Sequence, residues 1–199
     1  TLLVDARDGR SYRTVSIGTQ CWMAQNLDVG TLVLITSPQS DNGVIEKYCY
    51  GDSLVACTSY GGLYQWDEMM AYGPSDPANP STTRGICPTG WHLPSDAEYQ
   101  TLEMHLGMSA SDAALINLWR GADVGEQLRV GGTSGFDAPL GGRCGGGSCF
   151  GLGLYDYQAT SVEYGAYAWR RCLAHDSAEV GRFNTFPKAF GLSVRCALD

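Results

Sequence analysis

The stretch Gly90-Trp91-His92-Leu93-Pro94-Ser95-Asp96-Ala97-Glu98 decides how this chain folds. Its second half is a capping box, because the Ser95 hydroxyl can accept a hydrogen bond from the third helical amide while the Glu98 carboxylate reaches back to the amide of Ser95. Apolar residues then recur at helical spacing until Gly107 ends the run. The pattern predicts a helix over Asp96 to Leu106 that is entered by a turn from an extended segment.

The segments on either side of this helix alternate between strand and loop signals. The segment Leu63 to Tyr72 contains no helix breaker and carries a broad apolar face, so it predicts another helix. The other expected elements are two strands within residues 12–27, a short strand over 32–35, a surface loop over 36–47, a shorter helix over 111–119 and three or four strands in roughly the last fifty residues. Two main helices between β segments at both ends predict an α+β fold with a mainly antiparallel sheet and long loops.

The composition is that of an ordered, acidic domain. The chain has 199 residues, of which 26 are glycine and 44% are hydrophobic, which suits one domain over residues 1–199 with many turns. Lys and Arg number 13 against 21 Asp and Glu, and the net charge of −8 argues against nucleic acid as a partner because phosphates would be repelled. No stretch approaches the roughly 18 apolar residues of a membrane helix, so we expect no membrane insertion.

Eight cysteines indicate an oxidising compartment. An even number of cysteines in a glycine-rich chain is typical of a disulfide framework, although eight allow about 105 pairings. A zinc site would need cysteines or histidines at ligand spacing, and the closest cysteines, Cys144 and Cys149, have four residues between them. Disulfides are therefore favoured over metal, in a chain that is extracellular or displayed on the surface of a cell or virion.

A series of motifs runs in order along nearly the whole chain. They are Asp8-Gly9-Arg10-x-Tyr12, Ile17-Gly18-Thr19-Gln20-x-Trp22-Met23-Ala24-x-Asn26-Leu27, Tyr48-Cys49-Tyr50, Tyr60-Gly61-Gly62-Leu63-Tyr64-x-Trp66, Cys87-Pro88-x-Gly90-Trp91-His92-Leu93-Pro94-Ser95-Asp96-x-Glu98 and Gly191-Leu192-Ser193-Val194-Arg195-Cys196. Together they resemble the Fibrobacter succinogenes major paralogous domain. This resemblance implies a disulfide-stapled, C-type-lectin-like fold.

The resemblance also bears on how the cysteines pair. In C-type-lectin-like domains a cysteine near the helices is joined to one on the final strand, which implies the bridge Cys87–Cys196 here. The pairs Cys49–Cys57 and Cys144–Cys149 are each close enough in sequence to bridge locally. Cys21 and Cys172 then either bridge each other or stay free, and Cys172 stands where the family more often has an aromatic or polar residue.

Candidate acid–base residues each have a local structural explanation. Asp96 and Glu98 stand in the first turn of the expected helix, where carboxylates favour the positive end of the dipole. Asp67-Glu68 and Glu103 are interpreted as solvated helix faces, and His92 as a packed or hydrogen-bonded scaffold residue. These residues do not combine into a nucleophile, a base and an orienting group, so we expect no catalysis.

Calcium binding stays open. Sugar-binding C-type lectins coordinate calcium through Glu-Pro-Asn or Gln-Pro-Asp together with Trp-Asn-Asp, and neither set occurs in this sequence. A structural calcium ion held by loop oxygens, such as those of Ser40-Asp41-Asn42 or Asp52, is the alternative to plain solvated loops. No other cofactor is expected.

The stretch Tyr167 to Lys188, YAWRRCLAHDSAEVGRFNTFPK, is the candidate binding surface. Alternation along strands would divide its side chains between a core face and an exposed face. The core set resembles the family's recurring framework and comprises Trp169, Arg171, Leu173, Val180, Arg182 and Lys188. The exposed set departs from the family's usual Tyr- and Asn-rich residues and comprises Arg170, Cys172, Ala174, His175, Asp176, Gly181, Phe183 and Thr185. We expect this exposed set, with Tyr164 from the adjacent segment 158–164, to contact a ligand.

The exposed set also resembles the variable proteins of diversity-generating retroelements, which place adenine-mutagenised codons on a C-type-lectin-like surface. Each of its residues can be reached from an AAC or AAT asparagine codon by changing adenines alone, whereas Trp169 and Lys188 cannot. An ordinary exposed sheet face is the competing explanation, because most amino acids can be reached in this way.

The sequence thus predicts a non-catalytic ligand-binding protein that presents a hypervariable C-terminal surface to a protein or glycan on another surface. The alternative is a structural or adhesive domain of a cell-surface or pilus-like assembly. Nothing in the sequence indicates the oligomeric state.

Overall fold

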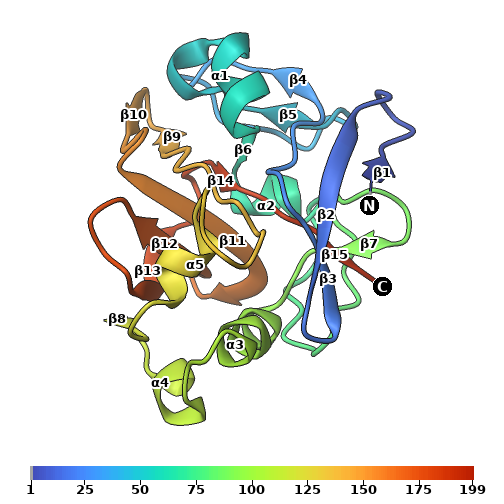
Figure 1. Ribbon diagram of the computed structural model, residues 1–199. Coiled ribbons are helices and arrows are strands. Elements are labelled where there is room, and N and C mark those ends of the chain that lie inside the picture. The colour runs from blue at the N-terminus through green and yellow to red at the C-terminus, as the bar shows by residue number, and fades with distance from the viewer. Residues whose placement is uncertain (1) are drawn as a thin grey trace.

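The computed structural model describes residues 2–199 as a mixed α/β structure that is mostly sheet (Figure 1). The strands are β1 Leu2–Val4, β2 Ser11–Ile17, β3 Gln20–Met23, β4 Thr31–Leu32, β5 Glu46–Lys47, β6 Leu63–Tyr64, β7 Trp91–His92, β8 Leu118–Arg120, β9 Arg143–Gly145, β10 Ser148–Phe150, β11 Tyr155–Tyr164, β12 Tyr167–Ala174, β13 Val180–Pro187, β14 Leu192–Ser193 and β15 Ala197–Leu198. The helices are the 3₁₀ turn η1 Tyr50–Asp52, α1 Leu54–Tyr60, α2 Trp66–Met69, α3 Asp96–His105, α4 Ala110–Ala114 and α5 Val124–Leu128.

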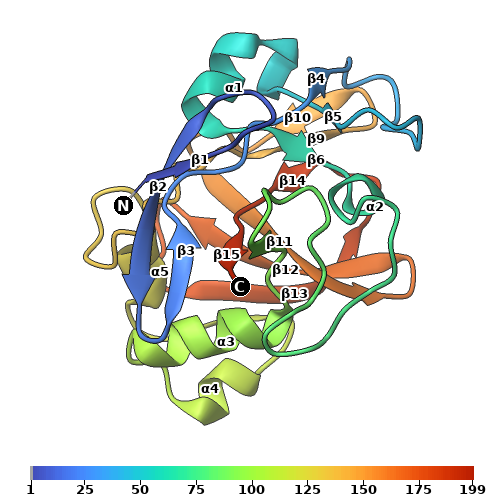
Figure 2. The same cartoon turned by 90° about the vertical axis from the view of Figure 1, so that its right-hand side faces the viewer.

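Two larger sheets organise the chain. One has the strand order β6-β14-β11-β12-β13-β8 and is built on the long meander β11-β12-β13, while the other has the order β1-β2-β3-β15-β7. Strand β15 lies between β3 and β7, so that the last strand of the chain joins the N-terminal hairpin (Figure 2). The pairings are antiparallel except for β11 with β14 and β4 with β5, which confirms the mainly antiparallel sheet.

The helix expected after the Gly90–Glu98 stretch is confirmed. In α3 the Ser95 hydroxyl accepts from the amide of Glu98, and the Glu98 carboxylate accepts from the amide of Ser95, which is the capping box that the sequence predicts. Tyr99 and Leu102 are buried in the cluster that also contains Leu173 of the six-stranded sheet. Helix α3 is thereby packed against that sheet.

The helix expected over residues 63–72 is wrong for most of its length. Its first two residues form β6, in which Tyr64 pairs with Leu192 of β14, and only the four-residue α2 follows. Ala71 and Tyr72 have φ values of 50° and 57°, which a right-handed helix cannot contain. The apolar face that suggested a helix is buried by strand pairing with a distant part of the chain.

The other local expectations are met in part. The early strands occur as β2 and β3, and the loop over 36–47 is irregular until β5. The strand expected over 32–35 is the shorter β4, and the helix expected over 111–119 stops at Ala114, because Leu118 begins strand β8. Helices α1 and α5 lack an apolar face long enough to be predicted from periodicity.

Three disulfides form as expected, and a fourth does not. Bridges join Cys49 to Cys57, Cys87 to Cys196 and Cys144 to Cys149. Cys21 and Cys172 are both free thiols, because Cys21 lies on β3 and Cys172 on β12, in different sheets. The disulfides indicate an oxidising, extracellular environment. Within residues 2–199, no helix is both long and apolar enough to span a membrane.

The closing motif of the chain is a buried anchor. The Arg195 guanidinium is fully buried, and its Nε donates to Asn26 Oδ1 at 2.8 Å while Nη2 donates to the carbonyl of Asp137 at 2.9 Å. Burial lowers the pKa of Arg195 to about 10. This side chain joins the C-terminal segment to Asn26, and the Cys87–Cys196 bridge joins it to the segment before α3.

Candidate binding surface

Side chains of β12 alternate between two faces of the six-stranded sheet, as expected. Arg171 and Leu173 point to the side where α3 packs, and Arg170 and Cys172 point to the other side. We call these the helix side and the outer side of the sheet. Both faces are substantially covered, so each must be described before a binding surface can be assigned.

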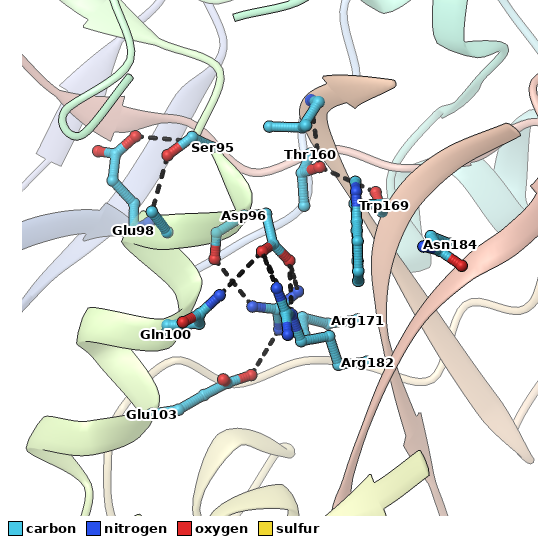
Figure 3. Close-up of polar contacts among 12 residues, drawn as sticks. Ser95, Asp96, Glu98, Gln100, Glu103, Thr160, Trp169, Arg171, Arg182 and Asn184 are labelled. Atoms are coloured by element: carbon cyan, nitrogen blue, oxygen red, sulfur yellow. Dashed lines mark hydrogen bonds and ion pairs between the residues drawn. The ribbon is translucent and has the colours of Figure 1, made fainter. Parts of the chain in front are cut away.

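The helix side carries a buried ion-pair network, and Figure 3 shows its members Asp96, Glu103, Arg171 and Arg182. Asp96 accepts from Arg171 and from Arg182 at 2.6 Å each, and Arg171 Nε also donates to Glu103 Oε1 at 2.6 Å. Arg120 pairs with the second oxygen of Glu103. Five charged side chains from α3, β8, β12 and β13 therefore form one continuous cluster.

The pKa shifts in this network are those of buried, permanently charged groups that stabilise the fold. Burial raises the pKa of Asp96, but the charges of Arg171 and Arg182 and their hydrogen bonds outweigh it and hold the pKa well below its ordinary value. Burial also lowers the pKa of Arg120 to about 10. The expectation that Glu103 is a solvated helix residue is wrong: it is fully buried, because its two oxygens are needed to neutralise arginines of the sheet.

Two further groups from the list of acid–base candidates are also buried. Glu68 accepts from the amide of Glu46 and the hydroxyl of Tyr72, so it is not the solvated residue that the sequence predicted, whereas Asp67 is exposed. His92 donates or accepts through both ring nitrogens, at 2.8 Å to Glu98 and 2.9 Å to Asp199. His92 thus joins the start of α3 to the end of the chain.

The outer side is dominated by aromatic rings. In the β12–β13 ladder Arg170 faces Phe183 and Ala168 faces Phe186, with a bulge between these two pairs. Because facing residues share a side of the sheet, the bulge places Phe183 and Phe186 on the same side although they are three positions apart. We define the aromatic–arginine face as this side of the sheet, with the residues Trp119, Arg143, Phe150, Tyr155, Tyr157, Arg170, Phe183, Phe186 and Phe190.

Phe186 is the centre of this face. Its ring stacks on Tyr157 with an interplanar angle of 9°, and it contacts two guanidinium groups, that of Arg170 at 4.4 Å and that of Arg143 at 4.8 Å from the ring centroid. Arg143 also lies 4.3 Å from the centroid of Phe190. Cation–π contacts of this kind hold both guanidinium groups over the aromatic rings of the sheet.

Small residues beneath the rings make room for them. A Cβ atom on Gly181 would come within 2.3 Å of the Phe183 ring, and Cys172 faces Gly181 in the ladder. Phe183 fills this space and packs edge-on against Trp119, with 5.9 Å between ring centroids. A small residue at position 181 is therefore required for the present position of Phe183.

The two arginines of the face have no acidic partner. Within residues 2–199, neither Arg143 nor Arg170 forms an ion pair, and Nε and Nη1 of Arg170 are buried without a hydrogen-bond partner. Burial is the main cause that lowers the pKa of Arg170. The face is covered by its own side chains, and five of them are half-buried and so partly exposed to solvent: Trp119, Arg143, Phe183, Phe186 and Phe190.

Comparison with known families shows to which family the chain belongs. A family model described as the Fibrobacter succinogenes major domain matches residues 15–197. The chain belongs to this family. No curated protein and no solved structure gives a significant match to it.

The nine residues expected to contact a ligand in this family member do not form one patch. Arg170, Cys172, Ala174, Gly181 and Phe183 lie on the aromatic–arginine face. The expectation that they are exposed is wrong for all but half-buried Phe183, because neighbouring rings cover the small residues and Arg170 is only 8% exposed.

The remaining four are exposed at the ends of the meander. His175 and Asp176 lie in the β12–β13 turn, and Tyr164 and Thr185 lie toward the opposite end. The residues that sequence reasoning missed are Trp119, Arg143, Tyr157, Phe186 and Phe190. Their aromatic and cationic types were a signal, but the bulge and the loop that bring them together have no local sequence signature.

Some oxygens in the loops considered for calcium accept hydrogen bonds within the chain. Asp52 Oδ1 accepts from the amide of Ile35 at 2.9 Å, and Glu46 accepts from both Ser40 and Asn42. In the described part of the chain, no group of three or more His, Cys, Asp or Glu side chains is arranged to hold a metal ion. These loops therefore support no particular calcium ligand set.

Proposed function

We propose that this chain is a non-catalytic binding module of C-type-lectin-like fold, displayed outside the cell, whose aromatic–arginine face recognises a protein or glycan on another surface. The observation that carries this proposal is the pair of unpaired arginines among half-buried aromatic rings on one side of a rigid sheet. Aromatic residues and arginine are the types most enriched at the centres of protein interfaces.

The proposed C-type-lectin-like fold is supported by contacts between the N-terminal and C-terminal parts of the chain. Strand β15 pairs with β3, and the Cys87–Cys196 bridge joins the segment before α3 to the C-terminal segment. This is the bridge that the resemblance to C-type-lectin-like domains implies. A frame closed in this way supports one domain that holds the sheet still while ligands bind to it.

The non-catalytic assignment draws on the partners of the titratable groups. Asp96 and Glu103 are neutralised by arginines, and both ring nitrogens of His92 are bonded to carboxylates. Groups paired in this way stabilise the fold and are not free to act as an acid, a base or a nucleophile. We propose that binding, rather than chemistry, is the task of the outer side.

The plain sheet face is the better account of the exposed set than retroelement diversification. Any side chain at position 181 would collide with Phe183 as it now stands, so these two positions could not vary independently. A diversified surface needs positions that each tolerate many side chains. Sequencing the gene for a nearby near-copy of its 3′ end that differs only at adenines would decide between the two accounts.

A structural or adhesive role is the second candidate, and edge strand β1 favours it. Leu2 and Val4 are 64% and 60% exposed on the outermost strand of the five-stranded sheet. An exposed apolar edge can pair with a strand of another chain. In that case β1, and not the aromatic–arginine face, would carry the contacts.

The two candidates can be separated by selecting ligands and then mapping them. A displayed library of random peptides and a glycan array are probed with the folded chain. We expect ligands whose affinity falls at least about tenfold, or about 1.4 kcal/mol, in the variant Phe183→Ala. The control is Val55→Ala on α1, which removes a smaller apolar group that is 76% exposed on a different element.

The proposal is contradicted if no ligand is selected, or if the selected ligands are insensitive to Phe183→Ala. Ligands lost in Leu2→Ser but not in Phe183→Ala would support the second candidate instead. Thermal unfolding of each variant shows whether the fold is retained, so that a loss of binding can be assigned to the surface.

A further inference from the structure

The two arginines of the aromatic–arginine face differ from the other buried cations of the chain. Lys47, Arg171 and Arg120 each contact a carboxylate, and Arg195 donates to carbonyls and to Asn26. Arg170 is also buried, at 8% exposure, yet two of its nitrogens have no partner in residues 2–199. A buried cation without a hydrogen-bonding anion is costly, since it loses hydration without compensation.

The missing group can come from a ligand. Arg143 and Arg170 lie against the same ring, that of Phe186, so their guanidinium groups belong to one site. Arginine binds carboxylates through paired, charge-assisted hydrogen bonds, and its flat stacking on a ring leaves the edge of the guanidinium free to donate. The chain has 21 acidic residues, and no ion pair joins one to either arginine in the described part of the chain.

An apolar hollow adjoins this site. It is lined by the rings of Phe186, Phe190 and Trp66 and by Ala159 and Ala168, with Lys188 at its side. Lys188 lies 4.1 Å from the centroid of Trp66 and pairs with Glu163. The hollow has a volume of only about 10 Å³, so an apolar group of a ligand that placed a carboxylate at the arginines would lie against the exposed edges of Phe186 and Phe190 and not inside it.

The chemistry of the face favours a peptide over a glycan. Sugar hydroxyl groups need acceptors as well as donors, whereas the outer side presents aromatic rings, alanine, glycine and two cations, and its side-chain oxygens are the hydroxyls of Tyr155 and buried Tyr157. Phenylalanine rings and guanidinium groups match apolar and acidic side chains.

Resting on the proposed function, we propose that the aromatic–arginine face binds an acidic peptide segment of a partner protein, with a carboxylate at Arg143 and Arg170 and a neighbouring apolar side chain against the ring of Phe186. The ring of Phe186 then separates the two subsites and contacts both parts of the ligand. Half-buried Arg143 makes the first contact, and the buried Arg170 is reached when the rings of Phe183 and Phe186 shift.

The test uses the peptide library on the folded chain. We expect enrichment of sequences in which Asp or Glu adjoins an apolar residue. A synthetic copy of the most enriched peptide should bind at least tenfold more weakly when its acidic residue is replaced by the amide, and its affinity should fall with added salt. Arg143→Gln should weaken the same peptide about tenfold, whereas the control Arg13→Gln, at an exposed arginine paired with Asp137, should not change it.

A second variant separates binding from folding. Arg170→Met keeps an unbranched apolar stem but removes the buried guanidinium group and its charge, so the free energy of unfolding should stay the same or rise while peptide affinity falls about tenfold. If this variant does not fold, Arg143→Gln still decides the question, because Arg143 is half-buried.

The inference is overturned if enriched peptides lack acidic residues, or if the amide peptide binds as well as the acid. It is also overturned if acidic glycans bind and peptides do not. In each of these outcomes, loss of the ligand in Phe183→Ala would leave the proposed binding role of the face intact, so the two failures are distinguishable.

Discussion

Asp96 Oδ2 accepts a hydrogen bond from Arg182 Nη2 at 2.6 Å, which fixes the first turn of α3 to the strand that carries Phe183 and Phe186 on its other side. The helix side of the sheet thereby holds the outer side in place. The residues of the proposed binding face and the residues of the ion-pair network are neighbours along the same strand, and they are separated only by the alternation of side chains.

Removing the Asp96 charge should destabilise the protein strongly. The variant Asp96→Asn leaves Arg171 and Arg182 buried without their shared carboxylate, so we expect a loss of about 3–5 kcal/mol in the free energy of unfolding. Urea unfolding at pH 7 measures this loss. The exposed Asp67→Asn serves as the control and should change stability by less than about 0.5 kcal/mol.

The same residue predicts acid sensitivity. Because the folded pKa of Asp96 lies below the unfolded value of about 3.9, its contribution is complete above that value and is lost as the pH falls toward the folded pKa. Stability of the wild type should therefore fall more steeply on acidification than that of Asp96→Asn. Parallel curves for the two proteins would show that the carboxylate is not coupled to the arginines.

His92 should give a pH dependence of the opposite sign. Burial lowers the pKa of His92, but its hydrogen bonds to Glu98 and Asp199 outweigh burial and place the pKa above the ordinary value. Its stabilising contribution is therefore complete below about pH 6.5 and is lost as the pH rises through the folded pKa. Unfolding free energies measured across this range should decrease in the wild type and not in His92→Gln, with the exposed His175→Gln behaving as wild type.

The disulfides should differ in their contribution to stability. The Cys87–Cys196 bridge spans 109 residues and the Cys144–Cys149 bridge only 5. By the loop-entropy relation, replacing both cysteines by alanine should cost about 5 kcal/mol for the first pair and about 2 kcal/mol for the second. Denaturant unfolding of the two double variants gives the comparison, and equal losses would rule out loop entropy as the main cause.

The two free thiols should differ in reactivity. Cys172 is buried, and burial raises its pKa to about 12, whereas Cys21 is half-buried. A thiol reagent should label Cys21 in the native protein and both cysteines after unfolding. The native signal should persist in Cys172→Ala and vanish in Cys21→Ala; rapid native labelling of Cys172 would mean that the aromatic–arginine face opens readily.

The sequence by itself determined the features that depend on neighbouring residues or on distinctive chemistry. The capping box of α3, the early hairpin, the family and three disulfides belong to this group. A capping hydrogen bond spans three positions, and a short cysteine loop can close locally, so both leave a readable pattern.

Only the tertiary structure decided what covers each face of the meander. Leu63 is a strand residue because it pairs with Ser193. Glu103 is buried because it and Asp96 together form ion pairs with arginines from three strands. The bulge in β13 places Phe186 on the same side of the sheet as Arg170. Arg143, which belongs to the separate β9–β10 sheet, contacts the ring of Phe186 as well. Contacts between distant segments depend on how the whole chain packs, and no local pattern encodes them.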